Sequence, residues 1–135
     1  ELGDLRRLRW LNIGGNNFAD IPLPVFRLSS LELLYLNANR LTTLDEAIDT
    51  LKQLRGLILN GNQLSLLPSS VGRLHNLTYF ALADNNLSSL PVSLMSLTNL
   101  EHMPVENNKL CDIPDTIAQW LDSFDREWRT WQDCR

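Results

Sequence analysis

Leucine and other aliphatic residues recur along the chain at a fixed spacing of 23 residues. The stretch LRGLILNGNQL, residues 54–64, shows the pattern, in which apolar residues alternate with small or polar ones ahead of a single asparagine, Asn62. This alternation predicts a short, half-buried β-strand with Leu57 and Leu59 on its buried face. Because asparagine is unfavourable in helix interiors and depleted in strands, Asn62 indicates a turn directly after the strand.

The same frame occurs five times without insertion or deletion. Three of its apolar columns are Leu8, Leu31, Leu54, Leu77 and Leu100; Leu11, Leu34, Leu57, Phe80 and Met103; and Ile13, Leu36, Leu59, Leu82 and Val105. The asparagine recurs at Asn16, Asn39, Asn62, Asn85 and Asn108. Self-similarity at such a period is typical of a solenoid, in which stacked units together bury one continuous core.

Each unit reads L-x-x-L-x-L-x-x-N-x-L, followed by a half that resembles L-P-x-x-L-x-x-L. The chain therefore resembles the leucine-rich repeat family over nearly its whole length. The resemblance implies an α/β solenoid curved into an arc, with a parallel β-sheet on the concave face and short 3₁₀ or irregular convex returns. It also implies five repeats within residues 1–114, with a truncated half-repeat at the start, and a C-terminal helical cap over residues 115–135.

The asparagine column predicts a structural ladder. A side-chain amide offers two donors and one carbonyl acceptor, which suits a turn whose backbone groups are buried. Stacked once per repeat, these amides would satisfy the turns and link neighbouring repeats.

The second repeat departs from the others in its second half. It has Asp45 where the other repeats carry a proline, and its segment DEAIDTL, residues 45–51, predicts a fuller helical turn than in the other repeats.

A solenoid exposes apolar cross-sections at both ends and needs caps there. At the C-terminal end, Thr116 followed by Gln119 fits a capping box. Four aromatic residues then fall at helical spacing: Trp120, Phe124, Trp128 and Trp131. They predict one helix, or two short ones broken near residues 122–123, that cover the last repeat. An aromatic cofactor box is the alternative interpretation.

At the N-terminal end the pattern begins in mid-repeat. Leu2 falls on the column of Val25, and Leu5 falls on the column of Leu28. We therefore expect a cap or further repeats ahead of Glu1 in a longer parent protein.

The two cysteines, Cys111 and Cys134, have no CxxC or paired-histidine context, so they do not indicate a metal site. A disulfide between them would fasten the cap to the last repeat, whereas two free thiols would fit a cytosolic protein. The tail resembles C-terminal flanks of some secreted leucine-rich repeat proteins, notably bacterial ones. That resemblance favours a secreted or extracytoplasmic location, with a cytoplasmic one as the alternative.

The candidate binding site is the concave face, where side chains are free of the core frame. It combines aromatic residues, which carry interface energy, with apolar and amide side chains. The predicted partner-binding residues are Trp10, Asn12, Leu33, Tyr35, Asn37, Ile58, Asn60, Tyr79, Asp84, His102 and Glu106. Small residues between them, Gly56, Ala81 and Ala83, predict a shallow trough. Alternating charges on the flank, Arg9, Glu32 and Arg55, predict ion pairs between repeats.

The chain has 135 residues and a formal net charge of −4, which fits one domain and does not suggest a nucleic-acid or anionic-membrane partner. It contains no apolar stretch of membrane-spanning length and no visible signal or transit peptide. Its two histidines, His75 and His102, lack convergent catalytic or metal-binding partners in the pattern. NIGGNN, residues 12–17, lacks the lysine of a phosphate-binding loop. No metal or cofactor is expected.

The sequence therefore predicts a non-enzymatic module that binds a protein or peptide on its concave face. A second interpretation is the recognition domain of a larger enzyme or receptor, such as a kinase, GTPase or ubiquitin ligase. A third is a structural or adhesive scaffold. The sequence leaves the oligomeric state open.

Overall fold

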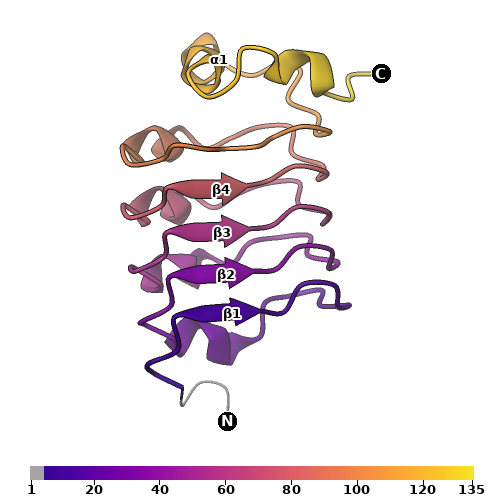
Figure 1. The fold of residues 1–135 in the computed structure, drawn as a ribbon. Helices are drawn as coiled ribbons and strands as arrows, with labels where there is room; N and C mark the ends of the chain where they lie inside the picture. Colours follow the sequence, from indigo (N-terminus) through magenta and orange to yellow (C-terminus); the bar gives the residue numbers. More distant parts are fainter. Residues whose placement is uncertain (1–4) are drawn as a thin grey trace.

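The computed structural model describes residues 5–135 as a stack of rungs with one parallel sheet (Figure 1). The strands are β1 (Trp10–Asn12), β2 (Leu33–Tyr35), β3 (Gly56–Ile58) and β4 (Tyr79–Ala81), in that order across the sheet. Neighbouring strands pair in parallel with a constant offset of one repeat, so that Trp10 lies opposite Leu33 and Gly56 lies opposite Tyr79. Equivalent residues of successive repeats therefore form straight columns across the sheet.

The fifth rung continues the sheet without a full strand, so the expectation of one strand per repeat is wrong there. Tyr79 pairs with His102 as an isolated bridge. The N–H of Leu82 donates to the carbonyl of Pro104 at 2.8 Å, but Pro104 has no N–H with which to donate to the fourth rung. A proline is tolerated here because it lies beyond the last full strand of the sheet.

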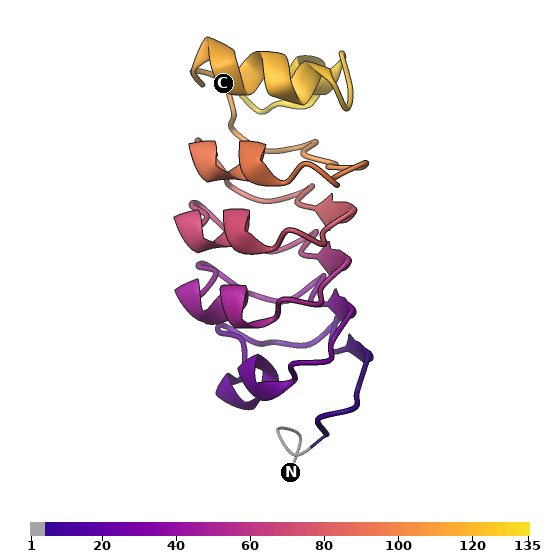
Figure 2. The ribbon, with the colours of Figure 1, turned by 90° about the vertical axis from the view of Figure 1, so that its left-hand side faces the viewer.

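Four short 3₁₀ helices line the opposite side of the stack (Figure 2). They are η2 (Leu23–Arg27), η3 (Glu46–Thr50), η4 (Ser69–Arg73) and η5 (Val92–Ser96). η3 has the same five-residue length as the others, so the predicted fuller helical turn in the second repeat is wrong. Asp45 replaces the proline directly, because its Oδ1 accepts a hydrogen bond from the Ala47 N–H at 2.8 Å and starts the turn.

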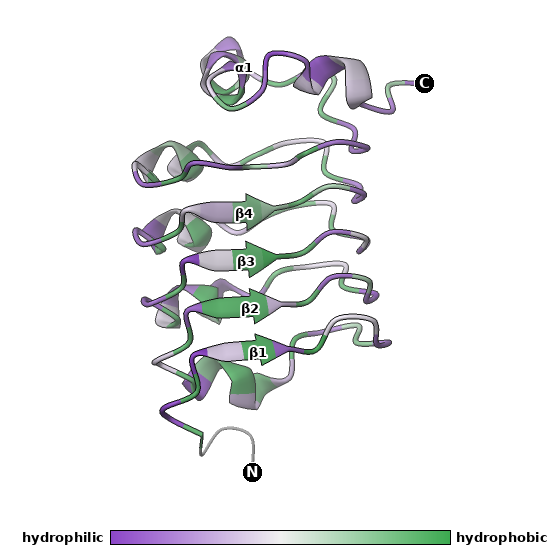
Figure 3. Cartoon of the chain, viewed as in Figure 1, coloured by the Kyte–Doolittle hydropathy of each residue, from purple (hydrophilic) through white to green (hydrophobic). Residues whose placement is uncertain are grey.

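The core fills the space between the sheet and the 3₁₀ helices. Leu34, Leu57 and Phe80, from successive strands, are completely buried. In Figure 3, green predominates in β2 and β3, while the turns beyond the strands are mainly purple. The first rung is less well covered, because four of its apolar residues are only partly buried: Leu8, Leu11, Ile13 and Phe18. Leu5 is exposed, and Leu2 lies outside the described residues.

The C-terminal cap consists of two short helices, α1 (Asp115–Asp122) and η6 (Trp128–Trp131), as one of the two predicted arrangements has it. The predicted capping box is wrong. Pro114 precedes the helix and makes no side-chain capping bond. The helix begins at Asp115, directly after this proline, so Thr116 already lies inside it.

The buried face of the cap is partly aromatic. Trp128 is 2% exposed, and Trp120 and Phe124 pack against the core with their rings edge to face at 5.0 Å. Trp131 is 52% exposed, so the prediction that all four aromatic residues join one packed face is wrong for this residue. Trp131 ends η6 at the edge of the cap, and nothing in the repeat pattern accounts for its exposure.

Candidate functional site

The amide ladder runs through the interior beside the sheet. Asn62 illustrates the pattern: its Nδ2 donates to the carbonyls of Leu59 at 2.9 Å and Leu36 at 3.0 Å, and its Oδ1 accepts from the Leu41 N–H at 3.0 Å. The same three kinds of bond recur at the other buried asparagines, Asn39, Asn85 and Asn108. Since every polar atom of these amides is used, this column has no group left for a ligand.

The two ends of the ladder differ. Asn16 is exposed, and among residues 5–135 its side chain bonds only within its own turn, to the carbonyls of Ile13 at 2.9 Å and Gly14 at 3.2 Å. At the other end Gln132 extends the ladder into the cap. Its Oε1 accepts from the Leu110 N–H at 3.2 Å, and its Nε2 donates to the Val105 carbonyl at 3.1 Å.

Gln132 was missed by sequence reasoning. It is a glutamine rather than an asparagine, and it lies one residue beyond the 23-residue period. The longer side chain makes up for this shift, so the cap copies the hydrogen bonds of a sixth rung. Close by, the Cys111–Cys134 disulfide joins the last repeat to the chain end, with the two Cα atoms 5.7 Å apart.

The outer face of the sheet, which we call the concave face, presents the predicted aromatic residues. Trp10 is 68% exposed and Tyr79 is 38% exposed, although both belong to regular strands. Leu33, Tyr35 and Ile58 lie between them and are half-buried. The five residues therefore form a largely apolar band across β1 to β4.

The predicted trough is absent at the centre of this band. Gly56 is buried because the Leu33 side chain lies over it, so that a Cβ at Gly56 would be only 2.6 Å from Leu33 Cδ2. Ala81 is also buried, with no exposed surface. The larger neighbours fill the space that the small residues leave, and the band is continuous instead of hollowed.

Three predicted amides border the band. Asn12 Oδ1 accepts from the Gly14 N–H at 3.0 Å, and a Cβ at Gly14 would lie 2.6 Å from Asn37 Oδ1. Asn60 Oδ1 is buried and accepts no hydrogen bond from the described residues. Asn37 and Asn60 are half-buried. Their amides therefore contribute more to packing at the ends of the strands than to hydrogen bonding with solvent.

On the strand-entry flank, Arg9 and Glu32 form a two-bond pair, with Nε to Oε1 at 3.0 Å and Nη2 to Oε2 at 2.8 Å. The hydrogen bond from Arg9 holds the pKa of Glu32 below its ordinary value. The predicted second pair is wrong, because Arg55 forms no ion pair with any described residue. Arg55 instead helps to line an open hollow of about 360 Å³ beside Trp10.

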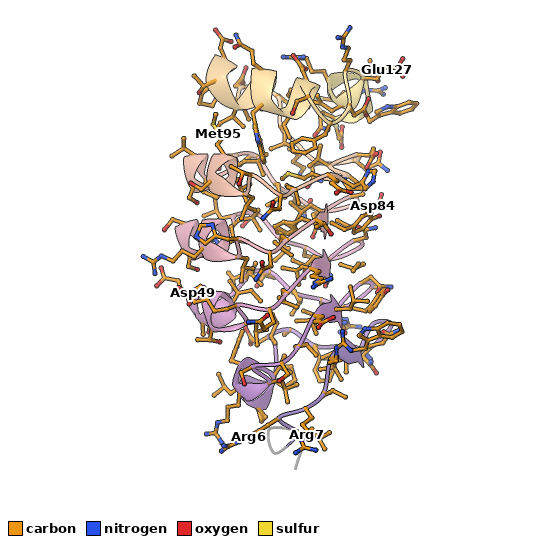
Figure 4. The ribbon with its side chains drawn as sticks, turned by 60° about the vertical axis from the view of Figure 1, so that its left-hand side comes forward. Arg6, Arg7, Asp49, Asp84, Met95 and Glu127 are labelled. Atoms are coloured by element: carbon orange, nitrogen blue, oxygen red, sulfur yellow. A yellow bond between two sulfur atoms is a disulfide. The ribbon has the colours of Figure 1, made fainter. Side chains whose placement is uncertain are left out.

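At the other edge, one residue of each repeat, three positions beyond the end of the strand or its equivalent, adopts a left-handed backbone conformation. These residues are Gly15, Ala38, Gly61, Asp84 and Asn107, with φ between +54° and +68°. The last two are linked, since Asn107 Nδ2 donates to Asp84 Oδ1 at 2.7 Å. Asp84 is exposed and carries negative charge beside the concave face, as Figure 4 shows.

At the capped end, the concave face leads into a small pocket of about 120 Å³. His102, Pro104 and Glu106 of the fifth rung line one wall. The opposite wall comes from the cap, with Phe124, Asp125 and Trp128 among its residues. Sequence reasoning missed this pocket, because no local pattern places residues 102–106 beside residues 124–128.

The described residues show no arrangement that indicates catalysis. Within residues 5–135 no three of His, Cys, Asp and Glu come together in a way that could hold a metal ion. The aromatic neighbour of His102 is the ring of Tyr79, at 6.0 Å between centroids. In the same residues no helix is both long and apolar enough to cross a bilayer.

The leucine-rich repeat family model matches residues 6–64, and the same frame and fold continue to the cap. The chain is a leucine-rich repeat protein. Domains of this family are in general protein–protein interaction modules that use their concave surfaces. No curated protein matches the chain in sequence.

Two solved structures of this family resemble the chain over most of its length. A leucine-rich repeat protein of Leptospira interrogans is 34% identical, with a TM-score of 0.83 over 90% of this chain and 31% of its own. The leucine-rich repeat domain of the type III effector XopL is 26% identical, with a TM-score of 0.78 over 87% of this chain and 43% of its own. This leucine-rich repeat chain thus spans less than half of either structure.

Proposed function

We propose that this leucine-rich repeat protein is a non-enzymatic module that binds a protein or peptide partner on its concave face. The observation that carries the proposal is the exposure of Trp10 and Tyr79 on regular strands of a rigid sheet. Large aromatic side chains lose little conformational entropy on binding and are enriched among the residues that dominate interface energy. Leu33, Tyr35 and Ile58 join them into one apolar band with polar borders, which is typical of a protein-binding surface.

Removing two aromatic side chains from the middle of the band tests this proposal. The double variant Tyr35→Ala, Tyr79→Ala should retain the melting temperature of the wild type within a few degrees, because both side chains contact solvent. It should lose the proteins that the immobilised wild-type chain retains from extracts of the source organism, identified by quantitative mass spectrometry.

The matched control is Leu23→Ala, Val92→Ala, which removes two exposed apolar side chains from the opposite, 3₁₀ side of the stack. This control should retain the same proteins as the wild type. Equal retention by both variants would refute a binding role for the concave face, as would a large loss of stability in the tyrosine variant with binding intact.

A second candidate function is that of a recognition domain within a larger enzyme or receptor, with the same concave face selecting the substrate. It is supported by the small share of both solved relatives that the chain spans, one of them an effector. The full-length open reading frame tests it, since a kinase, GTPase or ubiquitin ligase domain there would assign this chain a targeting role.

We further propose that the protein works in an oxidising compartment, supported by the Cys111–Cys134 disulfide. Intact mass of the protein from its native source, alkylated without reductant, should show no modified thiol. Two alkylated cysteines would contradict this location.

A further inference from the structure

The pocket between the fifth rung and the cap has an apolar floor and a polar mouth. Its floor includes Val105, Leu121 and Trp128, each exposed by no more than 3%. His102 and Asp125 at its mouth are exposed. Ligand sites for small molecules usually exceed ~300 Å³, so a pocket of about 120 Å³ fits the end of a single side chain.

The charge of this pocket is one-sided. Glu106 and Asp125 line it, and no lysine or arginine does. Neither carboxylate forms an ion pair with any residue in 5–135. One cap arginine, Arg129, is paired outside the pocket lining, because its Nη1 donates to Asp122 Oδ1 at 2.7 Å.

Further acids border the capped half of the concave face, with Glu101 exposed on its strand-entry flank and Asp84 exposed at its turn edge. Arginines gather at the N-terminal end of the stack, as Figure 4 shows for Arg6 and Arg7. A partner segment that lies along the concave face would therefore meet its more acidic surroundings at the capped end. Its own positive charge would be favoured at the acidic, capped end, next to the pocket.

The aromatic residues that line the pocket favour a guanidinium over an ammonium group. Phe124 is half-buried in the pocket wall, and the chain itself stacks a guanidinium on the neighbouring ring, with Arg129 Cζ 4.6 Å from the Trp128 centroid. A guanidinium group is planar and weakly hydrated, stacks on aromatic rings, and offers donors in a fork to carboxylates. An ammonium group is more strongly hydrated and gains less from an apolar floor.

We infer that this pocket receives the guanidinium of an arginine side chain from the polypeptide that binds the concave face. The guanidinium lies against the apolar floor and the aromatic wall while it pairs with Glu106 and Asp125, which line the same pocket. This assignment rests on the proposed function, and it makes the cap part of the binding surface as well as a cover for the core.

A nuclear magnetic resonance titration with the tripeptide acetyl-Gly-Arg-Gly-amide tests the inference at low salt. The resonances of the Trp128 indole N–H and the Leu121 methyl groups should shift and saturate. The same peptide with citrulline, a neutral arginine isostere, should give no saturable shift. This comparison uses the unmodified protein and is therefore independent of any effect of mutation on folding.

The double variant Glu106→Gln, Asp125→Asn should weaken the apparent affinity for the arginine peptide on the order of tenfold. Asparagine at position 125 keeps the oxygen that accepts the Glu127 N–H at 2.8 Å. The control Glu101→Gln removes an acid of the same rung that lies on the strand-entry flank and does not line the pocket, and it should bind as the wild type does.

Equal shifts with citrulline, no saturable shift at Trp128 and Leu121, or an unchanged affinity in the double variant would overturn the inference. If the arginine peptide fails while partner retention still depends on Tyr35 and Tyr79, only the pocket assignment is wrong. If retention is also independent of the two tyrosines, the proposed function fails as well.

Discussion

At the scale of single residues, the asparagine column links successive repeats through side-chain hydrogen bonds to the backbone. One Asn62 side chain bonds to backbone groups of Leu36, Leu41 and Leu59, which belong to two successive repeats. Its position could be predicted because the amide stands out in an apolar frame. What the sequence did not show is that Asn16 would be left in water, since that depends on what covers the first rung.

Replacing Asn62 by alanine should lower the free energy of unfolding by roughly 1–3 kcal/mol, because the buried Leu41 N–H would lose its acceptor and the Leu36 and Leu59 carbonyls would each lose one of two donors. Chemical denaturation of the variant measures this. The matched control is Asn16→Ala, which removes an exposed amide of the same column and should cost less than about 0.5 kcal/mol. Equal losses would show that burial is not what gives the amide its importance.

The left-handed turn residues make a second prediction at this scale. Gly61 has φ +68°, and a Cβ there would meet only ordinary contacts at 3.6 Å. Gly61→Ala should therefore lower the free energy of unfolding by about 1 kcal/mol through backbone strain alone. The reverse change at the equivalent position, Ala38→Gly with φ 54°, should not destabilise the protein. Thermal melts of both variants check the opposite signs.

At the scale of elements, the repeat pattern predicted the strands and the short segments on the opposite side of the stack. The differences from that prediction came from the chemistry of single residues. Pro104 removes a donor and reduces the fifth strand to a bridge. Asp45 imitates a proline through its side chain, so η3 is no longer than its neighbours. Pro114, not Thr116, is the N-cap of α1. In each case a side-chain or proline effect at one position overrode the pattern around it.

The cap contains a carboxylate, Asp122, whose pKa is lowered. Its contribution to the stability of the fold therefore depends on pH. The Trp128 Nε1–H donates to Asp122 Oδ1 at 2.8 Å and is the main cause, with Arg129 adding to it. A carboxyl group with a lower pKa in the folded state stabilises the fold above its unfolded pKa of about 4. That stabilisation is lost as the pH falls through the folded pKa.

Unfolding monitored by tryptophan fluorescence between pH 7 and pH 3 should therefore show a stability advantage of the wild type over Asp122→Asn. This advantage should be constant at neutral pH and disappear in acid below pH ~4. An advantage that grows on acidification would have the opposite sign and would contradict a lowered pKa at Asp122.

The Cys111–Cys134 disulfide also attaches the cap to the last repeat. Cys111 and Cys134 are separated by 23 positions, and closing a loop of this size stabilises by about 3 kcal/mol in the chain-entropy account. The variant Cys111→Ser, Cys134→Ser should lose about that amount in guanidinium unfolding, and reduction of the wild type should have a similar effect. A loss well under 1 kcal/mol would mean that Gln132 and the apolar contacts hold the cap alone.

At the scale of the whole molecule, the repeat frame predicted the architecture and the solvent-facing columns, because both follow from periodicity alone. The band through Tyr35 and Tyr79 was predictable in this way. Its filled centre was not, because the Leu33 rotamer covers Gly56. The pocket under the cap was not predictable either, since it depends on where α1 and η6 settle on the fifth rung.

Because the first rung is only partly covered, local unfolding of the stack is expected to begin at this rung. Each rung is stabilised only by its neighbours, so local unfolding starts where one neighbour is weakest. Backbone amide protons around Leu11 and Ile13 should exchange with deuterium fastest, and those around Leu82 and Val105, between well-covered rungs and a cross-linked cap, slowest. Any ligand seated near Trp10 would slow that fraying, whereas one seated near His102 would leave it unchanged.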